Sequence, residues 1–143
     1  YLDEIRSVNA VSIHVRRGDY VNDKETNAVH GVCSIDYYRE AINRLSGEIS
    51  EPRFYIFSDD MDWARANLPI SPHLAVYVDN NQMASHEDLR LMSSCKHHII
   101  ANSSFSWWGA WLSDYAGKKV IAPRNWFRTL ENKDIIPNGW ITL

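Results

Sequence analysis

The sequence has little of what identifies the simplest functional classes. Cysteine occurs only at Cys33 and Cys95 among 143 residues, with no CxxC pair. This argues against a zinc site or a disulfide scaffold and favours a reduced, cytosolic protein. No apolar run approaches the length of a membrane span, and no signal-peptide pattern opens the chain. The net charge of −3 argues against a nucleic-acid partner, because nucleic-acid-binding domains are normally basic.

Phosphate-loop and metal-ligand patterns are also missing or weak. There are only six glycines, and neither GxGxxG nor GxxxxGKS occurs, so any bound phosphate would depend on side chains. The acids Asp59, Asp60 and Asp62 are better explained by the first turn of a helix, where its dipole favours negative charge. His97 and His98 are sequential in a predicted strand, so they point to opposite faces and cannot chelate one ion.

The composition is that of a folded domain. The chain is 45% hydrophobic and 23% charged, and 143 residues suffice for one ordinary domain, which we assign to residues 1–143. Six tryptophans make it rich in aromatic residues. The first residue is Tyr1 rather than methionine, so we expect a fragment that lacks an upstream domain.

The order of apolar segments predicts alternating strands and helices. Strands are expected at residues 11–15, 53–57, 74–78, 98–101 and 119–122. Helices are expected after the cap Ser34 up to Gly47, after Asp60 through Leu68, and at 85–95 and 104–116, with a long polar loop at 19–32. This order predicts an α/β fold with a doubly wound, mainly parallel, Rossmann-like sheet. Such folds place ligands beyond the carboxyl ends of their strands, here at residues 16–19, 58–60, 79–81, 102–106 and 123–126.

The adjacent Arg16 and Arg17 directly follow the first predicted strand. Two neighbouring guanidiniums repel each other, and a diphosphate offers both the charge and the acceptor oxygens to hold them together. Gly18 would let the backbone approach a ligand closely. The structural alternative is that one arginine pairs with Asp19 or Asp59 while the other is solvated. His14 is either a core histidine bonded to the backbone or a group that orients a phosphate.

The segment 102–106, Asn-Ser-Ser-Phe-Ser, joins a predicted strand to a predicted helix. Its hydroxyls fit N-capping by Ser103 or Ser104, and the same N–H groups form a favourable anion site. The helix is expected to bury Phe105, Trp108, Leu112 and Tyr115. For the tryptophans we expect Trp108 and Trp111 in the core and Trp107 exposed to a ligand or a partner.

Two motifs resemble a known enzyme family. The run HVRRGDY at 14–20 and the run DLRLMSSCKHHIIANSSFSWWGAWL at 88–112 closely resemble the two strongest motifs of the α-1,2-fucosyltransferases, glycosyltransferase family 11. FSDD at 57–60 and VIAP at 120–123 match further stretches of the family in the right order. The resemblance implies the C-terminal, donor-binding half of a two-domain GT-B enzyme, without the N-terminal acceptor half.

The resemblance also implies a reaction and a set of site residues. The family transfers L-fucose from GDP-β-L-fucose to the 2-hydroxyl of a terminal β-galactoside, with inversion and without an obligatory metal or other cofactor. Arg17 and Asp19 would be catalytic, with Asp19 either a general base or a partner that orients an arginine. The donor-binding residues would be His14, Arg16, Arg17, Ser58, Asp59, Asn102, Ser103, Ser104, Phe105 and Ser106.

Three functions remain open from the sequence. The first is a bacterial, cytoplasmic fucosyltransferase, whose isolated fragment would bind GDP-fucose weakly and transfer little sugar. The second is a non-catalytic nucleotide-sugar binding module. The third is an adhesion domain using Arg17-Gly18-Asp19, although a tripeptide alone is weak support. A Golgi enzyme is the alternative location, with any membrane association supplied by missing segments or by the acceptor.

Overall fold

A computed structural model of the chain describes residues 1–79, 85–130 and 134–143. It contains a six-stranded, all-parallel sheet with the order β3-β2-β1-β4-β5-β6. The strands are β1 (Asn9–Val15), β2 (Pro52–Ser58), β3 (Ala75–Tyr77), β4 (His97–Ile99), β5 (Val120–Ala122) and β6 (Ile141–Thr142). The helices are α1 (Leu2–Ser7), α2 (Gly18–Asn22), α3 (Lys24–Val29), α4 (Ile35–Glu48), α5 (Met61–Asn67), the short 3-10 helix η1 (Pro72–Leu74), α6 (Ser85–Ser94) and α7 (Ser104–Trp111).

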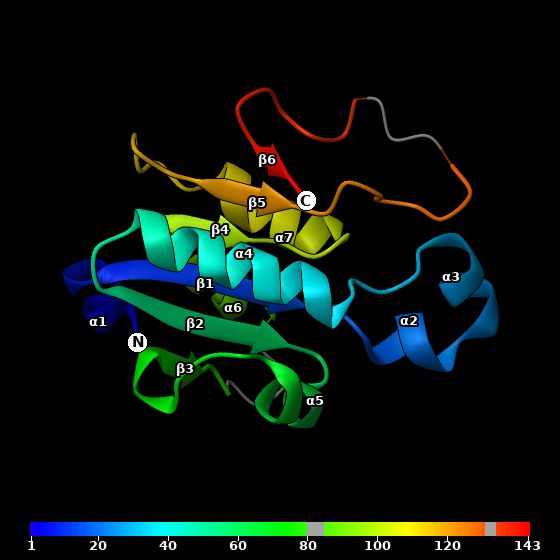
Figure 1. The fold of residues 1–143 in the computed structure, drawn as a ribbon, viewed down its shortest axis with the longest axis horizontal. Coiled ribbons are helices and arrows are strands. Elements are labelled where there is room, and N and C mark those ends of the chain that lie inside the picture. Colours follow the sequence, from blue (N-terminus) through cyan, green and yellow to red (C-terminus); the bar gives the residue numbers. More distant parts are fainter. Residues whose placement is uncertain (80–84, 131–133) are drawn as a thin grey trace.

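Helices cover both faces of the sheet, which confirms the expected doubly wound α/β fold. Figure 1 shows α4 in front of the sheet, with α6 and α7 behind it. The chain leaves β1 toward one edge through β2 and β3 and returns to place β4 on the other side of β1. A reversal of this kind leaves a crevice at the carboxyl ends of the two central strands, where doubly wound proteins bind their ligands.

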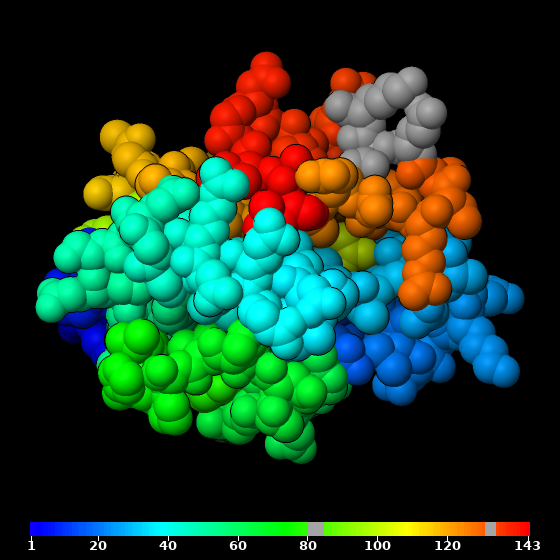
Figure 2. Space-filling view, viewed as in Figure 1, coloured from blue at the N-terminus to red at the C-terminus, as the bar shows by residue number. Residues whose placement is uncertain are grey.

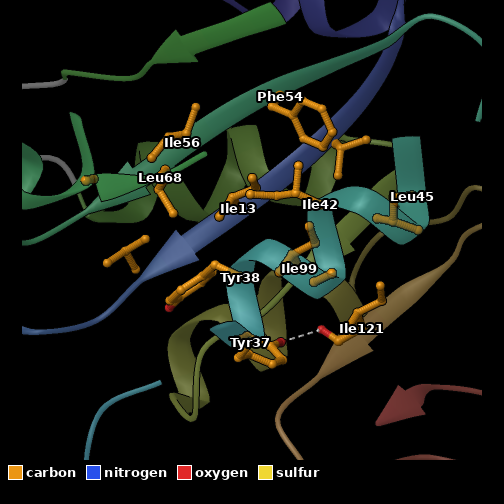
Figure 3. Close-up of a cluster of buried hydrophobic side chains, with 14 of the residues drawn as sticks. Ile13, Tyr37, Tyr38, Ile42, Leu45, Phe54, Ile56, Leu68, Ile99 and Ile121 are labelled. Atoms are coloured by element: carbon orange, nitrogen blue, oxygen red, sulfur yellow. Dashed lines mark hydrogen bonds between the residues drawn. The ribbon is translucent and has the colours of Figure 1, made fainter. Parts of the chain in front are cut away.

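The helix α4 forms as its sequence predicts. The Ser34 hydroxyl accepts the backbone N–H of Tyr37 at 3.1 Å, and Tyr38, Ile42 and Leu45 are buried against the sheet (Figure 3). Tyr37 is also buried, and its hydroxyl donates to the carbonyls of Ile100 and Ile121, at 2.6 and 3.1 Å. This phenol ties α4 to the two strands β4 and β5. The predicted stop at Gly47 is one residue early, because the helix runs to Glu48.

The predicted loop at residues 19–32 is wrong, because this segment contains α2 and α3. The Asp23 side chain accepts the backbone N–H groups of Glu25 and Thr26, at 2.9 and 3.0 Å, and so caps α3. The amide of Asn27 donates to the carbonyl of Tyr20 and joins the two helices. Helices this short bury no residue fully, so they carry no apolar periodicity that sequence analysis could detect. Figure 1 shows both beyond the carboxyl ends of β1 and β2.

The predicted buried face of α7 is also wrong. Trp108, Leu112 and Tyr115 are exposed, and so is Trp111, while Ser106, Gly109 and Ala110 face inward. The reason is the close contact of α7 with α6: a Cβ on Gly109 would lie 3.1 Å from the Cβ of Met92. Only small side chains fit there, so the large rings turn outward.

Trp107, expected to be exposed, is partly buried instead. Its indole N–H donates to the Ile135 carbonyl at 2.8 Å, and its ring lies between those of Trp111 and Trp140. The helix ends at Trp111 rather than at 116, because the ammonium of Lys118 folds back onto the carbonyls of Ala110, Trp111 and Ser113. In the described ranges no helix is both long and apolar enough to cross a bilayer.

Candidate functional site

A hollow of about 730 Å³ lies at the carboxyl ends of β1 and β2 and is closed on its far side by the start of α7. We call it the first hollow. It brings together segments that are up to 90 residues apart in the chain. Its lining residues are His14, Arg16, Asp19, Tyr20, Thr26, His30, Phe57, Ser58, Asp59, Ser85, Asp88, Ser103, Ser104 and Phe105.

The two arginines that follow β1 point in different directions. Arg16 lines the first hollow, where its guanidinium contacts Asp19 at 2.8 Å and Asp59 at 3.3 Å. Arg17 does not line it: its guanidinium contacts Asp60 at 3.3 Å and lies 4.1 Å from the ring centre of Trp63. Both arginines therefore have acidic partners, so the alternative in which one of them is merely solvated is wrong. The Arg16 guanidinium thus lines the first hollow, and the Arg17 guanidinium connects the turn after β1 to the start of α5.

Asp59 holds the turn after β1 in place. One carboxylate oxygen accepts the backbone N–H of Arg17 at 2.8 Å, and the other accepts that of Gly18 at 3.0 Å. A Cβ on Gly18 would lie 2.8 Å from the second oxygen, so this contact leaves no room for a side chain. Asp60 in turn caps α5 by accepting the N–H of Trp63 at 3.1 Å. Asp60 thus serves the helix, as its position predicted, whereas Asp59 holds the turn after β1.

His14 forms part of the floor of the first hollow. The residue is only 5% exposed, its ring lies 5.6 Å from that of Phe105, and its Nδ1 is buried without a hydrogen-bond partner. Burial, together with the positive charge of Arg16, lowers the pKa of His14 to about 3. The imidazole is therefore neutral at physiological pH, with an unsatisfied polar atom that a ligand could satisfy.

The amino end of α7 lies at the wall of the same hollow. Ser103 occupies the N-cap position but makes no capping hydrogen bond with its side chain, so the predicted capping by this residue is wrong. Ser103, Ser104 and Phe105 all line the hollow. Uncapped N–H groups at a helix start carry a partial positive charge and bind anions. Ser106 does not line it, because its hydroxyl turns inward to the carbonyls of Ala101 and Ser103.

Asn102 is a structural clamp rather than a wall of the first hollow. It is 2% exposed, and its amide N–H groups donate to the carbonyls of His30, Gly31 and Trp126, at 2.8, 3.2 and 3.2 Å. Its amide oxygen accepts the thiol of Cys33 at 3.6 Å. The side chain thus joins the segment after α3 to the segment after β5, and it lies on the wall of a second hollow.

The second hollow has a volume of about 680 Å³ and opens beside the carboxyl ends of β4 and β5. Figure 2 shows it between the cyan start of α4, the orange segment after β5 and the blue helices α2 and α3. His30 lines both hollows and so stands between them. The other lining residues are Gly31, Val32, Cys33, Ser34, Tyr37, Asn102, Pro123, Arg124, Asn125, Phe127, Arg128, Leu130 and Leu143.

Several lining residues of the first hollow were not predicted from the sequence. Three of them, Tyr20, Thr26 and His30, lie in the segment predicted to be a loop. The capping residue Asp23 is the only local signal of a helix in that segment. Phe57 and Asp88 each begin one of the motif stretches, but neither was predicted as a site residue. Asp79 follows β3, which ends at Tyr77, and does not line the hollow, while Asn80 and Asn81 lie outside the described residues. No set of three His, Cys, Asp or Glu side chains suited to a metal ion occurs in the described ranges.

Comparisons with known proteins agree on one family. The model described as "Glycosyl transferase family 11" matches residues 2–143. An Escherichia coli protein named "O-antigen biosynthesis glycosyltransferase WbnK" is 40% identical over 139 residues, covering 96% of this chain and 45% of that protein. The "Alpha-1,2-colitosyltransferase" of Escherichia coli is 42% identical over 146 residues, covering 99% and 50%. The "Galactoside 2-alpha-L-fucosyltransferase SEC1" of Bos taurus is 34% identical over 104 residues, covering 72% and 28%. The chain thus spans half or less of the length of these relatives.

Proposed function

Because the chain belongs to glycosyl transferase family 11, we propose that it is the part of an α-1,2-fucosyltransferase that binds GDP-β-L-fucose for inverting transfer to the 2-hydroxyl of a galactoside. The observation that carries the proposal is the convergence of three features on the first hollow. These are the Arg16 guanidinium, the uncapped start of α7 and the unsatisfied, neutral His14. A diphosphate offers acceptor oxygens to the guanidinium and to the N–H groups of α7, and its negative charge suits both.

The proposed chemistry is stabilisation of the leaving group. When the bond between fucose and phosphate breaks, its electron pair remains on GDP, so negative charge grows on the diphosphate. Asp19 and Asp59 fix the Arg16 guanidinium before the reaction, and the N–H groups of α7 are fixed by the helix. Preorganised charge of this kind is worth about 2.7–4 kcal/mol of transition-state stabilisation for one donor. Ser58, Ser103, Ser104 and Phe105 would complete the donor site.

Arg17 takes a different part in this proposal. Because its side chain is turned to Asp60 and Trp63, it acts on the donor through the turn that carries Arg16. Asn102 and Ser106 likewise shape the site through the backbone they hold. Asp19 is proposed as the partner that orients Arg16, since the two side chains form an ion pair.

The printed names of the relatives differ in the sugar that is transferred. The printed name of one relative specifies colitosyl transfer and that of another specifies fucosyl transfer. Both names place the new bond at position 2. We propose fucose on the motif resemblance, and GDP-linked colitose is the donor to compare it with. A bacterial, cytoplasmic location is proposed from the similarity to Escherichia coli proteins.

Calorimetric titration of the complete natural protein with GDP-fucose tests the proposal. Arg16→Ala should weaken binding about 10- to 100-fold, since it removes a charged contact worth about 1.5–3 kcal/mol. Arg39→Ala is the matched control, because that guanidinium lies on α4 and pairs with Asp36. Absence of binding, or equal binding by the Arg16→Ala variant, would refute the donor site.

Transfer assays on the same protein separate an enzyme from a binding module. We expect fucose transfer to a β-galactoside such as lactose, at a rate that EDTA does not change, because fixed cations replace the metal that other transferases use. Donor binding with neither transfer nor hydrolysis would favour a non-catalytic module. Loss of activity in EDTA, with recovery on adding Mg²⁺, would contradict the metal-independent mechanism.

A further inference from the structure

Resting on the proposed function, we infer that the second hollow contacts the acceptor sugar at its reacting hydroxyl and that His30 is the general base that takes the proton from this hydroxyl. The inference comes from where this histidine stands. It is the one described residue that lines both hollows with a titratable side chain, so it lies between the proposed donor and the space beside it.

The position of His30 is fixed from several directions. Its backbone N–H donates to the carbonyl of Thr26 at 2.9 Å, and its own carbonyl accepts the amide of Asn102 at 2.8 Å. The ring stacks on Tyr20 with centroids 4.9 Å apart and planes 20° apart. The ring of Phe127 also lies against it, with centroids 5.3 Å apart and planes at 51°. A side chain held this firmly is suited to a positioned proton transfer.

The backbone conformation at Gly31, directly after His30, is also restricted. Gly31 has a φ of 64°, which disfavours any residue with a Cβ, and the side chain of Arg128 lies against the space where a Cβ would be. The N–H of Arg128 donates to the Val29 carbonyl at 2.8 Å. The segment carrying the histidine is therefore locked to the segment that carries Phe127.

The two ring nitrogens of His30 differ. Among the described residues, the buried Nδ1 has no hydrogen-bond partner. With hydrogen on Nδ1, Nε2 carries the lone pair that can accept a hydrogen bond. A hydroxyl placed in the second hollow can donate its hydrogen bond there.

The walls of the second hollow have the chemistry of a sugar site. Phe127 and Leu130 offer apolar surface for the C–H face of a pyranose, and Asn125 and Ser34 offer hydrogen-bonding groups. Neither Asp nor Glu occurs among its described lining residues, so acceptor hydroxyls meet donors such as Arg128 and the single histidine base.

The proposed step balances as a single displacement. The acceptor O–H bond breaks and its proton goes to Nε2 of His30, while the oxygen forms the new bond to the anomeric carbon of the donor sugar. The bond between that carbon and the phosphate oxygen breaks, and its electron pair leaves with GDP. The imidazolium then returns the proton to water. Attack from the side opposite the diphosphate gives the inverted linkage.

Charged and titratable groups line the two hollows around His30. Tyr20, whose phenol is titratable, stacks on His30 from α2, whereas its neighbours Asn102 and Phe127 carry no titratable group. On the side of the first hollow these groups are Arg16, Asp19, Asp59 and Asp88, and on the side of the second hollow they are Cys33, Arg124 and Arg128. Burial raises the pKa of Cys33 to about 11, so this thiol is neutral and does not compete as a base at neutral pH.

The variant His30→Gln in the complete natural protein tests the base. We expect kcat to fall by about 100-fold or more, with little change in the Kd for GDP, because a general base contributes about 10²–10⁴-fold to rate. His73→Gln, at an exposed histidine in η1, is the control and should change neither.

The result also decides between His30 and Asp19. A kcat within about threefold of wild type in His30→Gln overturns the assignment of His30. Loss of rate without loss of GDP affinity in Asp19→Asn, with His30→Gln unaffected, assigns the base to Asp19. If the wild-type protein does not bind GDP-fucose, the proposed function itself is refuted. This outcome differs from failure of the His30 assignment, in which GDP-fucose still binds.

Surface variants test the second hollow without disturbing the fold. Asn125 and Leu130 are exposed, and the Asn125→Ala, Leu130→Ala double variant should raise the KM for the acceptor about tenfold at unchanged Kd for GDP. Leu112→Ala is the matched control, with a leucine that is 55% exposed compared with 58% for Leu130. An unchanged acceptor KM in the double variant overturns the acceptor site, whether or not the His30 variants fold.

Discussion

The carboxylate of Asp59 and the backbone of Gly18 are in direct contact across the ends of β2 and β1. One carboxylate oxygen accepts the Gly18 N–H at 3.0 Å and would lie 2.8 Å from any Cβ at that residue. The same carboxylate holds the N–H of Arg17 and lies 3.3 Å from the guanidinium of Arg16. A single acid thus fixes the turn and one of the arginines that the first hollow depends on.

Replacing Gly18 by alanine should disrupt this contact. The methyl group forces Asp59 to move, so we expect the affinity for GDP to fall about tenfold and the free energy of unfolding to fall by about 1 kcal/mol. Titration calorimetry and urea denaturation measure the two effects. Gly47→Ala is the control: nothing lies within 4 Å of its added Cβ, and alanine near the end of α4 should raise stability by up to about 1 kcal/mol. Unchanged GDP binding in Gly18→Ala would contradict the role of the Asp59 contact.

Replacing Asn102 by alanine should destabilise the whole chain. The change leaves the carbonyls of His30, Gly31 and Trp126 without their buried amide donor, so unfolding should become about 2–4 kcal/mol easier. Asn67→Ala removes a single exposed bond to the Trp63 carbonyl and should change stability by about 0.5 kcal/mol or less. If denaturant unfolding shows equal losses of stability in the two variants, the buried bonds of Asn102 stabilise the chain no more than the exposed bond of Asn67 does.

The tryptophans of α7 should separate by position. Trp107→Ala should lower the free energy of unfolding by about 2–3 kcal/mol, because this ring is packed between two others and its N–H is bonded to Ile135. Trp108→Ala should lower it by less than about 1 kcal/mol, because that ring is 50% exposed. If urea denaturation shows a larger loss of unfolding free energy for Trp108→Ala than for Trp107→Ala, the result contradicts the exposed position of Trp108.

Stability should fall in mild acid because of two buried histidines. Burial is the main cause that lowers the pKa of both His14 and His98 to about 3, from 6.5. The unfolded chain therefore binds protons that the folded chain does not, so this stability is present above pH 6.5 and is lost as pH falls toward 3. Each histidine should remove about 2 kcal/mol between pH 6.5 and pH 5.

Urea denaturation at several pH values checks this loss. His98→Gln should reduce the dependence on pH, because its ring, bonded to the Ser12 hydroxyl at 2.8 Å, no longer titrates. His73→Gln should leave it unchanged, because that side chain is exposed. The same free energy of unfolding at pH 7 and pH 5 would contradict the lowered pKa values.

The order of elements was readable because local signals agree with the fold. The runs 11–15 and 53–57 are short, β-branched or aromatic, and buried, so they predict strands wherever they are placed. Ser34 and the apolar spacing after it predict α4, and the motif resemblance correctly identified the family. Prediction was wrong where local signals are weak, as in α2 and α3, or where a neighbour overrides them. The outward turn of Trp108 depends on Met92, which no pattern within α7 reveals.

The sequence by itself determined the α/β fold, the family and the strand ends at which a site forms, since periodicity, capping and motif residues are local properties of the chain. Only the tertiary structure decided which side chains share a space. Adjacent Arg16 and Arg17 diverge because Asp59 and Asp60, more than 40 positions away, hold them in different directions. Asn102, predicted as a donor-site residue, joins two loops through its buried amide, while His30, in a predicted loop, lines both hollows. The physical reason is that directions and contacts depend on packing partners that are distant in the sequence.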